Sequence, residues 1–172
     1  MEMCKPWLDT QGLSGEDAAA MKREVETQRL VERKKVVRDG KETWCVSVRG
    51  ILFNGEKRKV GISIPSPVGH SFSVEYDRYL TPDPKTAPPA GDSTGRWTRL
   101  RQEHIRVGNG KNTIWKCREF VDGRLVNSGD SKVYNHMSFH SADPAVQIHY
   151  DGIEVRQLMP VPAGEGSAVP RP

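Results

Sequence analysis

Apolar and polar residues alternate in short segments along most of the chain, and turn dipeptides separate these segments. The dipeptides are Asp39-Gly40, Asn54-Gly55, Asn109-Gly110, Asp122-Gly123 and Asp151-Gly152. Each lies between segments rich in Val, Ile, Thr and aromatic residues, and such dipeptides tolerate the positive φ that tight hairpins require. The pattern predicts a mainly β protein, an antiparallel β-sandwich or barrel built from hairpins.

The segment 44–64 predicts the first hairpin in detail. A three-residue loop at 53–55, with Gly55 in the left-handed conformation, places six apolar residues on one buried face. These residues are Trp44, Val46, Val48, Val60, Ile62 and Ile64. A two-residue Asn-Gly turn would instead place Ser63 and Gly61 opposite the valines, so we favour the longer loop.

Two later dipeptides also predict pairings. A two-residue turn at Asp151-Gly152 pairs Tyr150 with Ile153 on an apolar face, so we expect the last hairpin to cover a core and meet solvent. At Asp122-Gly123 the same rule pairs Phe120 with Leu125.

One helix is expected before the strands, over about 15–30. Ser14 has the position of an N-cap, and Asp17 three residues later forms a near-match to a capping box. Met21 and Val25 belong to a short apolar stripe at helical spacing. The far end is ambiguous, because "RLVERKKVV" fits either a continued helix or the start of a strand.

Two segments lack apolar periodicity. Residues 80–95 hold four prolines and two glycines, which indicates a long surface loop or a linker. Residues 159–172 are typical of a flexible Pro-rich tail. We therefore expect one β-rich domain over 1–158. The alternative is two small β units joined by 80–95, each marginal for independent burial.

Composition and charge narrow the class of protein. The chain has 172 residues, a formal charge of +4 and three cysteines, an odd number at wide spacing that argues against a disulfide framework. No apolar run approaches the roughly 18 residues that span a bilayer, and the N-terminus lacks a secretory pattern. We expect an intracellular protein in a reducing compartment, neither secreted nor membrane-spanning.

The chain shows no sequence signature of catalysis or of a metal site. It lacks the glycine-rich phosphate loops, the nucleophile elbow and the zinc-protease motif. "HMSFH" places His136 and His140 four apart, but on a strand they would lie about 13 Å apart, too far to share an ion. Cys45 and Cys117 fit small apolar strand residues. We predict no enzyme, no metal and no cofactor.

Positive charge gathers in two blocks. Residues 22–59 hold twelve Lys and Arg against six Asp and Glu, and residues 96–132 hold nine against four. The second block interleaves cations with Trp97, Trp115 and Phe120, of which Trp115 is expected in the core. Rings that stack on bases beside cations that neutralise phosphates are typical of single-stranded nucleic-acid surfaces. The candidate contact residues are Arg96, Arg99, Arg101, Arg106, Lys111, Lys116, Arg118, Phe120 and Arg124, with Lys57, Arg58 and Lys59 from the first block.

These observations predict a small binding protein that contacts RNA or single-stranded nucleic acid through Arg-rich strands. One alternative is a structural or assembly protein, such as a viral or phage matrix, coat or adaptor subunit. It would bind a protein partner or itself through the sheet, and acidic membrane is a less favoured contact. The basic strand faces also fit a purely solvated surface. An enzyme without a recognisable motif is the third alternative.

Overall fold

The computed structural model describes residues 4–81, 94–108 and 110–159, and its strands pair antiparallel in three sheets. The large sheet has the order β10-β9-β8-β7-β12-β3-β2. Its strands are β2 (Val31–Arg38), β3 (Lys41–Arg49), β7 (Phe72–Leu80), β8 (Trp97–Val107), β9 (Ile114–Val121), β10 (Arg124–Ser131) and β12 (Gln147–Gln157). The small sheet has the order β1-β6-β11, formed by β1 (Lys5–Leu8), β6 (Val60–Pro65) and β11 (His136–Ser141).

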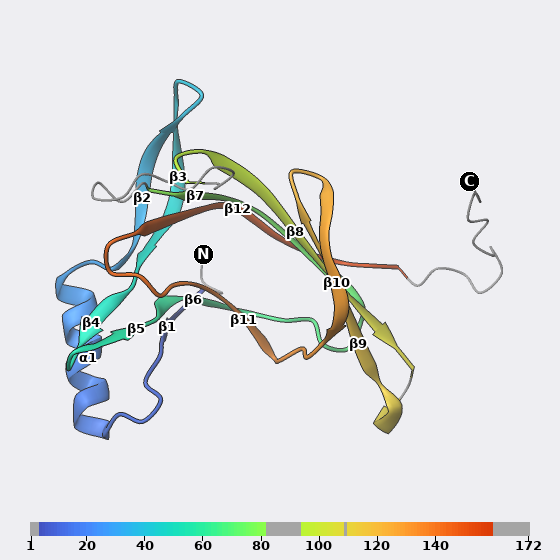
Figure 1. Ribbon diagram of the computed structural model, residues 1–172, viewed down its shortest axis with the longest axis horizontal. Helices are drawn as coiled ribbons and strands as arrows, with labels where there is room; N and C mark the ends of the chain where they lie inside the picture. Colours follow the sequence, from blue (N-terminus) through green and yellow to red (C-terminus); the bar gives the residue numbers. More distant parts are fainter. Residues whose placement is uncertain (1–3, 82–93, 109, 160–172) are drawn as a thin grey trace.

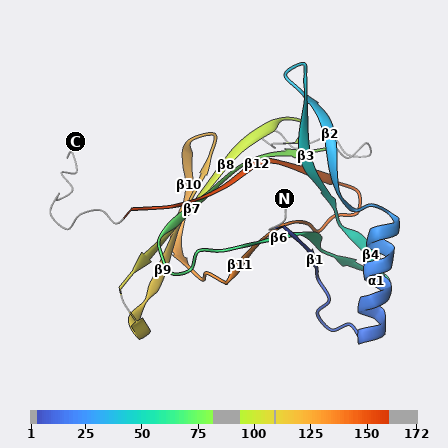
Figure 2. The same cartoon turned by 180° about the vertical axis from the view of Figure 1, so that it is seen from behind.

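The remaining elements are the β4–β5 pair, the helix α1 and the short 3-10 helix η1. The bounds are Ile51–Phe53 for β4, Glu56–Arg58 for β5, Gly15–Thr27 for α1 and Gly110–Asn112 for η1. The large sheet arches over the small one, with α1 and β4–β5 at one end and the β9–β10 arm at the other (Figure 1). The view from behind shows the same two layers (Figure 2). The predicted class, mainly β and antiparallel with one helix, is confirmed.

The main core lies between the arch and the small sheet. Phe139 of β11 packs edge-on against Tyr76 of β7 and Tyr150 of β12, with ring centroids 5.0 and 5.5 Å away. The Tyr150 hydroxyl also donates a hydrogen bond of 3.1 Å to the His140 carbonyl in β11. Aromatic packing and one hydrogen bond therefore join the two layers. The buried residues of this cluster are Val48, Ile62, Ile64, Phe72, Val74, Phe139 and Tyr150.

The helix begins as predicted and ends earlier. Ser14 caps it, since its side chain accepts a hydrogen bond from the Asp17 backbone N–H, and the last helical residue is Thr27. Arg29 then has a φ of 52°, which leaves the helical region, and the ambiguous segment continues as strand β2. Met21 and Val25 face a second core cluster with Leu30, Ile51 and Val60.

The predicted hairpin over 44–64 is wrong. The chain leaves the large sheet after β3, and the Asn54-Gly55 turn joins only the short strands β4 and β5. Both turn residues have positive φ, 49° and 79°, as a two-residue turn requires. Strand β3 pairs instead with β2 and β12. Trp44 consequently lies outside the core and is half exposed.

Gly50 is the physical reason for this change of sheet. Its backbone N–H donates to the Asp143 carbonyl, and a Cβ at this position would lie 2.7 Å from the Ala142 carbonyl carbon. Only a residue without a side chain permits this close crossing of two backbones. The apolar pattern of 44–64 is therefore divided between two sheets.

The predicted hairpin at Asp151-Gly152 is also wrong. Residues 147–157 form one strand, β12, that runs antiparallel to β7 along its whole length. Gly152, with a φ of 57°, lies in a bulge between Asp151 and Glu154. The extra residues are accommodated without reversing the chain, because a glycine bulge kinks a strand locally.

Two other turn predictions are confirmed. Asp39-Gly40 joins β2 to β3, and Asp122-Gly123 joins β9 to β10 with Phe120 opposite Leu125, as expected. Of the two segments expected to be irregular, 82–93 and 160–172 lie outside the described residues. The segment 80–95 follows β7 and precedes β8, and these two strands are neighbours in one sheet. Within the described residues, the helices are too short or too polar to cross a membrane.

We predict that Gly61→Ala destabilises the fold by about 1–3 kcal/mol, the cost of overpacking a core. Gly61 lies in the middle of β6 between β1 and β11, and a Cβ there would collide with the Phe139 carbonyl oxygen. Urea unfolding measures the change. Gly129→Ala in β10 is the matched control, since its Cβ would meet open space. Equal unfolding midpoints for the two variants would contradict the prediction.

Candidate nucleic-acid interface

The outer face of the arch carries a network of ion pairs centred on Asp77. One carboxylate oxygen lies 2.7 Å from the Arg38 guanidinium and the other lies 3.1 Å from the Arg99 guanidinium. Arg38 also lies 3.5 Å from Asp151, and Arg99 lies 2.9 Å from Glu75. Asp77 is only 8 % exposed, so its charge requires these partners. The hydrogen bond with Glu75 raises the pKa of Arg99 above its ordinary value.

A second group surrounds Glu103 on β8. Arg118 of β9 lies 2.6 Å from its carboxylate and Arg101 lies 3.5 Å away. The Arg101 guanidinium also covers the Phe120 ring at 4.2 Å from its centroid. Phe120 therefore lies on the wet face, as the alternation indicates, but its ring already has a cation over it.

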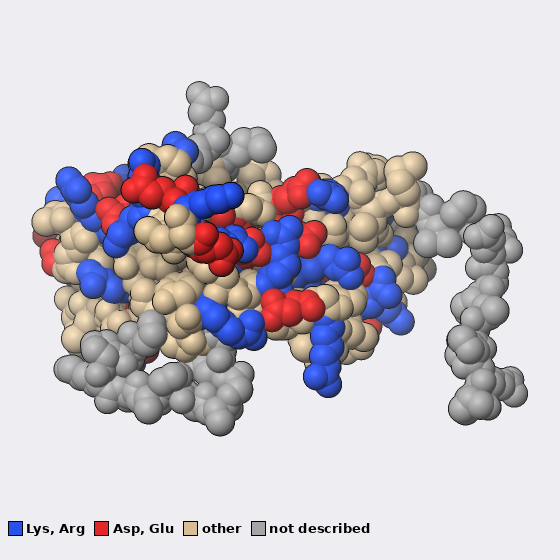
Figure 3. Space-filling model, turned by 90° about the horizontal axis from the view of Figure 1, so that it is seen from above, with Lys and Arg blue, Asp and Glu red and all other residues tan. Residues whose placement is uncertain are grey.

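These arrangements neutralise much of the predicted basic block. Arg96 completes the pattern, since it lies 2.9 Å from Asp122. Figure 3, which views the arch from above, shows Lys and Arg mixed with Asp and Glu over this face. The Arg residues that suggest phosphate binding in the sequence thus hold neighbouring strands together in the structure.

The other predicted contact residues do not form one surface. Lys111, Lys116 and Arg124 are exposed on η1 and the β9–β10 arm, and Arg106 donates to the Gly69 carbonyl. The remaining three, Lys57, Arg58 and Lys59, lie in or directly after β5, at the opposite end of the molecule from that arm (Figure 1). Their contact with nucleic acid stays a prediction.

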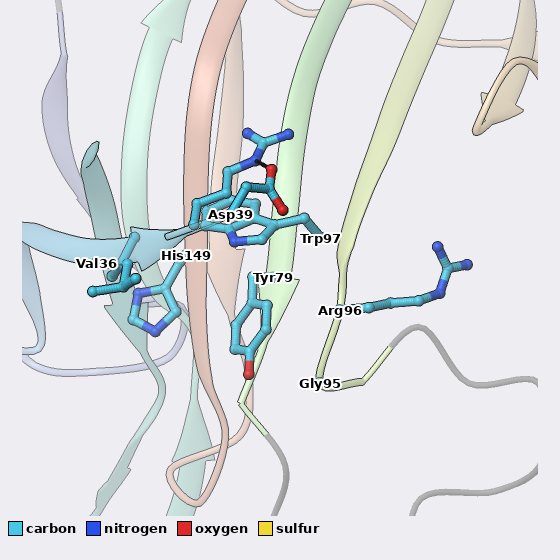
Figure 4. Close-up of a pocket in the computed structure, with 9 residues that line it drawn as sticks. Val36, Asp39, Tyr79, Gly95, Arg96, Trp97 and His149 are labelled. Carbon is cyan, nitrogen blue, oxygen red and sulfur yellow. Dashed lines mark ion pairs between the residues drawn. The ribbon is translucent and has the colours of Figure 1, made fainter. Parts of the chain in front are cut away.

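A row of three rings lies further along the outer face. Trp97 of β8, Tyr79 of β7 and His149 of β12 are directly opposite one another in the strand register. The ring centroids are 5.6 Å apart between Trp97 and Tyr79 and 5.9 Å apart between Tyr79 and His149. The three rings line a hollow of about 590 Å³ together with Val36 and Arg38 of β2 (Figure 4). We call this feature the aromatic hollow.

Two arginines flank the aromatic hollow. Arg38 places its guanidinium 4.8 Å from the centroid of the Trp97 ring. Arg96 points away from the rings, and its side chain is 53 % exposed (Figure 4). Sequence reasoning noted Trp97 within the basic block but missed Tyr79 and His149. Tyr79 and His149 can be recognised as part of this row only from the register between β7, β8 and β12, which the turn dipeptides do not specify.

Cys45 and His149 form a buried pair beside the aromatic hollow, with the sulfur 3.7 Å from Nδ1. Burial raises the pKa of Cys45 to about 11, and burial lowers the pKa of His149, with Lys34 adding to the effect. Burial therefore favours the neutral form of both side chains. Nucleophilic catalysis by a cysteine requires the thiolate, which burial disfavours at Cys45. Within the described residues, no three His, Cys, Asp or Glu side chains gather in a metal-binding arrangement.

Comparison of the chain with protein-family models, with curated proteins and with solved structures finds no match in any of the three.

We predict that Asp77→Asn lowers the free energy of unfolding by about 1–3 kcal/mol, because it leaves two guanidinium groups without their shared buried carboxylate. Thermal or urea unfolding measures the loss. Glu154→Gln is the matched control, since it removes one exposed pair with Arg156 on the same strand and should change stability little. An unaltered unfolding midpoint in Asp77→Asn would show that the network does not stabilise the sheet.

Proposed function

We propose that this protein binds single-stranded nucleic acid, RNA in the first place, with the aromatic hollow as the main contact. The observation that carries the proposal is the row formed by Trp97, Tyr79 and His149, one ring from each of three neighbouring strands. Bases stack on aromatic side chains presented by a β-sheet, and such stacking tolerates any sequence because every base has a flat face. The hollow has space for a planar group beside these rings.

The charges around the hollow set how phosphates are held. Arg96 is the best placed cation, because its pair with Asp122 is exposed and such pairs contribute little. A phosphate can replace that carboxylate at small cost. Arg99, Arg101 and Arg118 would have to leave buried or half-buried carboxylates to do the same. Binding therefore relies on stacking more than on charge.

The buried Cys45–His149 pair also favours binding over catalysis. An activated cysteine has a lowered pKa, whereas burial raises that of Cys45. His149 lines the hollow although it is only 5 % exposed, and Cys45 is its buried neighbour. A base in the hollow would therefore meet chiefly the half-buried rings of Trp97 and Tyr79, which suits stacking.

We predict that Trp97→Ala weakens binding of a labelled oligonucleotide of about 12 nucleotides by about 1–3 kcal/mol, the cost of losing one stacked base. Fluorescence anisotropy at several salt concentrations measures this. The salt dependence should be shallow, with a slope of about 0.7 for each phosphate contact and few contacts in total. Trp97→Ala should leave that slope nearly unchanged, because it removes a ring and no charge.

The matched control is Tyr134→Ala, which removes an exposed ring that does not line the aromatic hollow. It should bind as the parent protein does. Circular dichroism and thermal unfolding establish that both variants are folded. If folded Trp97→Ala and Tyr79→Ala bind as tightly as the parent, the aromatic hollow is not a nucleic-acid site.

Self-association through the sheet is a second candidate function, and strand β10 favours it. Among the described strands, β10 has β9 as its only neighbour in the large sheet, and it is exposed from Arg124 to Asp130. It lacks lysine and presents Leu125 and Val126, each more than half exposed. The other edge, β2, carries five charged residues, the usual protection against edge pairing. An antiparallel pair of β10 strands would place the Arg124 end of one copy beside the Asp130 end of the other.

We predict that this contact gives concentration-dependent dimers that nuclease treatment does not remove. Val126→Lys should shift the protein to monomer, because a charge on an edge strand opposes pairing. Val37→Lys places the same change on the β2 edge, also at an exposed valine, and should leave the dimer intact. Light scattering measures the mass, and a parent protein that is monomeric at every concentration would refute this candidate.

A further inference from the structure

The β2–β3 hairpin presents a second aromatic site on the face opposite the aromatic hollow. Trp44 is 48 % exposed there, although tryptophan usually packs in a core. The Arg33 guanidinium lies 4.6 Å and the Lys35 ammonium 5.5 Å from the centroid of its ring. Val37, on the same face of β2, is 71 % exposed. We call Trp44, Arg33, Lys35 and Val37 the Trp44 site.

The alternation of β2 places the two sites on opposite faces of one hairpin. Arg33 and Lys35 alternate with Val36 and Arg38, which line the aromatic hollow, and so lie on the other face. Val37 shares the face of Arg33 and Lys35 by alternation and also borders the hollow at the edge of β2. The hairpin projects beyond the rest of the arch (Figure 1, Figure 2). Its outer strand, β2, is an edge of the large sheet. A chain lying in the hollow can therefore pass over this edge without crossing another element of the sheet.

The fold gives little reason for a tryptophan at this position. The main core takes in Val46 and Val48 from the same strand, but Trp44 is not part of it. The contacts with Arg33 and Lys35 are at an exposed site, where cation–π pairs are weak. The ring is thus half exposed and remains accessible beside two cations. This is the combination that single-stranded nucleic-acid surfaces use for stacking.

Charge on the hairpin also suits a polyanion. Residues 31–44 contain five Lys and Arg against three Asp and Glu. Lys35 pairs with Glu42, and Arg38 belongs to the Asp77 network. In the described part of the chain, Arg33, Lys34 and Lys41 form no ion pair. By the strand register, Arg33 lies on the face of Trp44, and Lys34 and Lys41 lie on the face of the aromatic hollow.

We propose that Trp44 is a second stacking site for the same nucleic-acid strand, which leaves the aromatic hollow, crosses the edge of β2 and stacks on Trp44. This inference rests on the proposed function of the aromatic hollow. It adds a requirement on the length of the ligand. A short oligonucleotide contacts only the aromatic hollow, whereas a longer one contacts both faces of the hairpin. The ligand class is single-stranded nucleic acid longer than the few nucleotides that the hollow holds.

The test compares two oligonucleotides, a trinucleotide and one of about 12 nucleotides, within the site sizes known for single-strand binders. Trp44→Ala should weaken binding of the longer one about fivefold or more, the range for loss of one stacked base, and leave the trinucleotide unaffected. Trp97→Ala should weaken both. Trp44→Phe keeps a ring and should retain most of the affinity, and Tyr134→Ala should change neither. Thermal unfolding establishes that the variants are folded.

The outcomes separate the two proposals. If Trp97→Ala changes neither affinity, the function of the aromatic hollow is wrong. If Trp97→Ala weakens both and Trp44→Ala weakens neither, only the second site is wrong. An equal loss for both lengths in Trp44→Ala would also overturn the path across β2. The last measurement is binding to vesicles of anionic phospholipid. Trp44-dependent binding to them, without any effect on RNA, would assign the Trp44 site to a lipid surface.

Discussion

The packing of Phe139 between Tyr76 and Tyr150 is the interaction on which the rest of the structure depends. It joins β11 of the small sheet to β7 and β12 of the arch, and the Tyr150 hydroxyl fixes the two layers further through the His140 carbonyl. One face of the central strands is thereby committed to the core. Because side chains alternate along a strand, the residues between them must face outward. Asp77 and Tyr79 on β7 occupy the outer face for this reason.

Buried carboxylates on that outer face form ion pairs with the arginines and so determine the positions of the guanidinium groups. Asp77 and Glu103 are nearly inaccessible to solvent, and each meets two guanidinium groups from other strands or from its own. Arginine suits this position because its planar fork can donate to two acceptors at once and stays charged when half-buried. A high density of arginine on β-strands therefore has a structural cause here. Its value as a sign of nucleic-acid binding is lower than the sequence alone indicates.

Short-range chemistry was predictable from the sequence, and long-range pairing was not. The Ser14 cap and the turns at Asp39-Gly40 and Asp122-Gly123 depend on a few neighbouring residues, and the structure contains them. The dipeptides Asn54-Gly55 and Asp151-Gly152 carry the same local signal, but the first forms a turn only between the short strands β4 and β5, and the second forms no hairpin. Before the first dipeptide the chain crosses another backbone closely at Gly50, and in the second dipeptide Gly152 lies in a strand bulge.

The candidate site was unpredictable for a related reason. β12 lies between β7 and β3 in the large sheet although it is the last strand of the chain. His149 and Tyr79 are therefore neighbours across 70 residues of sequence, and no periodicity within either segment indicates it. The sequence did indicate that aromatic residues and cations are interleaved over 96–132. It could not indicate which rings meet.

Arg38 connects the two aromatic sites physically. Its guanidinium binds Asp77 on β7 and approaches Asp151 on β12, and it also covers the Trp97 ring on β8. An edge hairpin of this length would otherwise be held mainly by its own strand pairing. Arg38 attaches the outer strand of the hairpin to three strands of the arch that do not pair with it. The pairing of β2 with β3 places the Trp44 site on the face opposite the aromatic hollow, and Arg38 adds ion pairs and a ring contact that hold this hairpin against the arch.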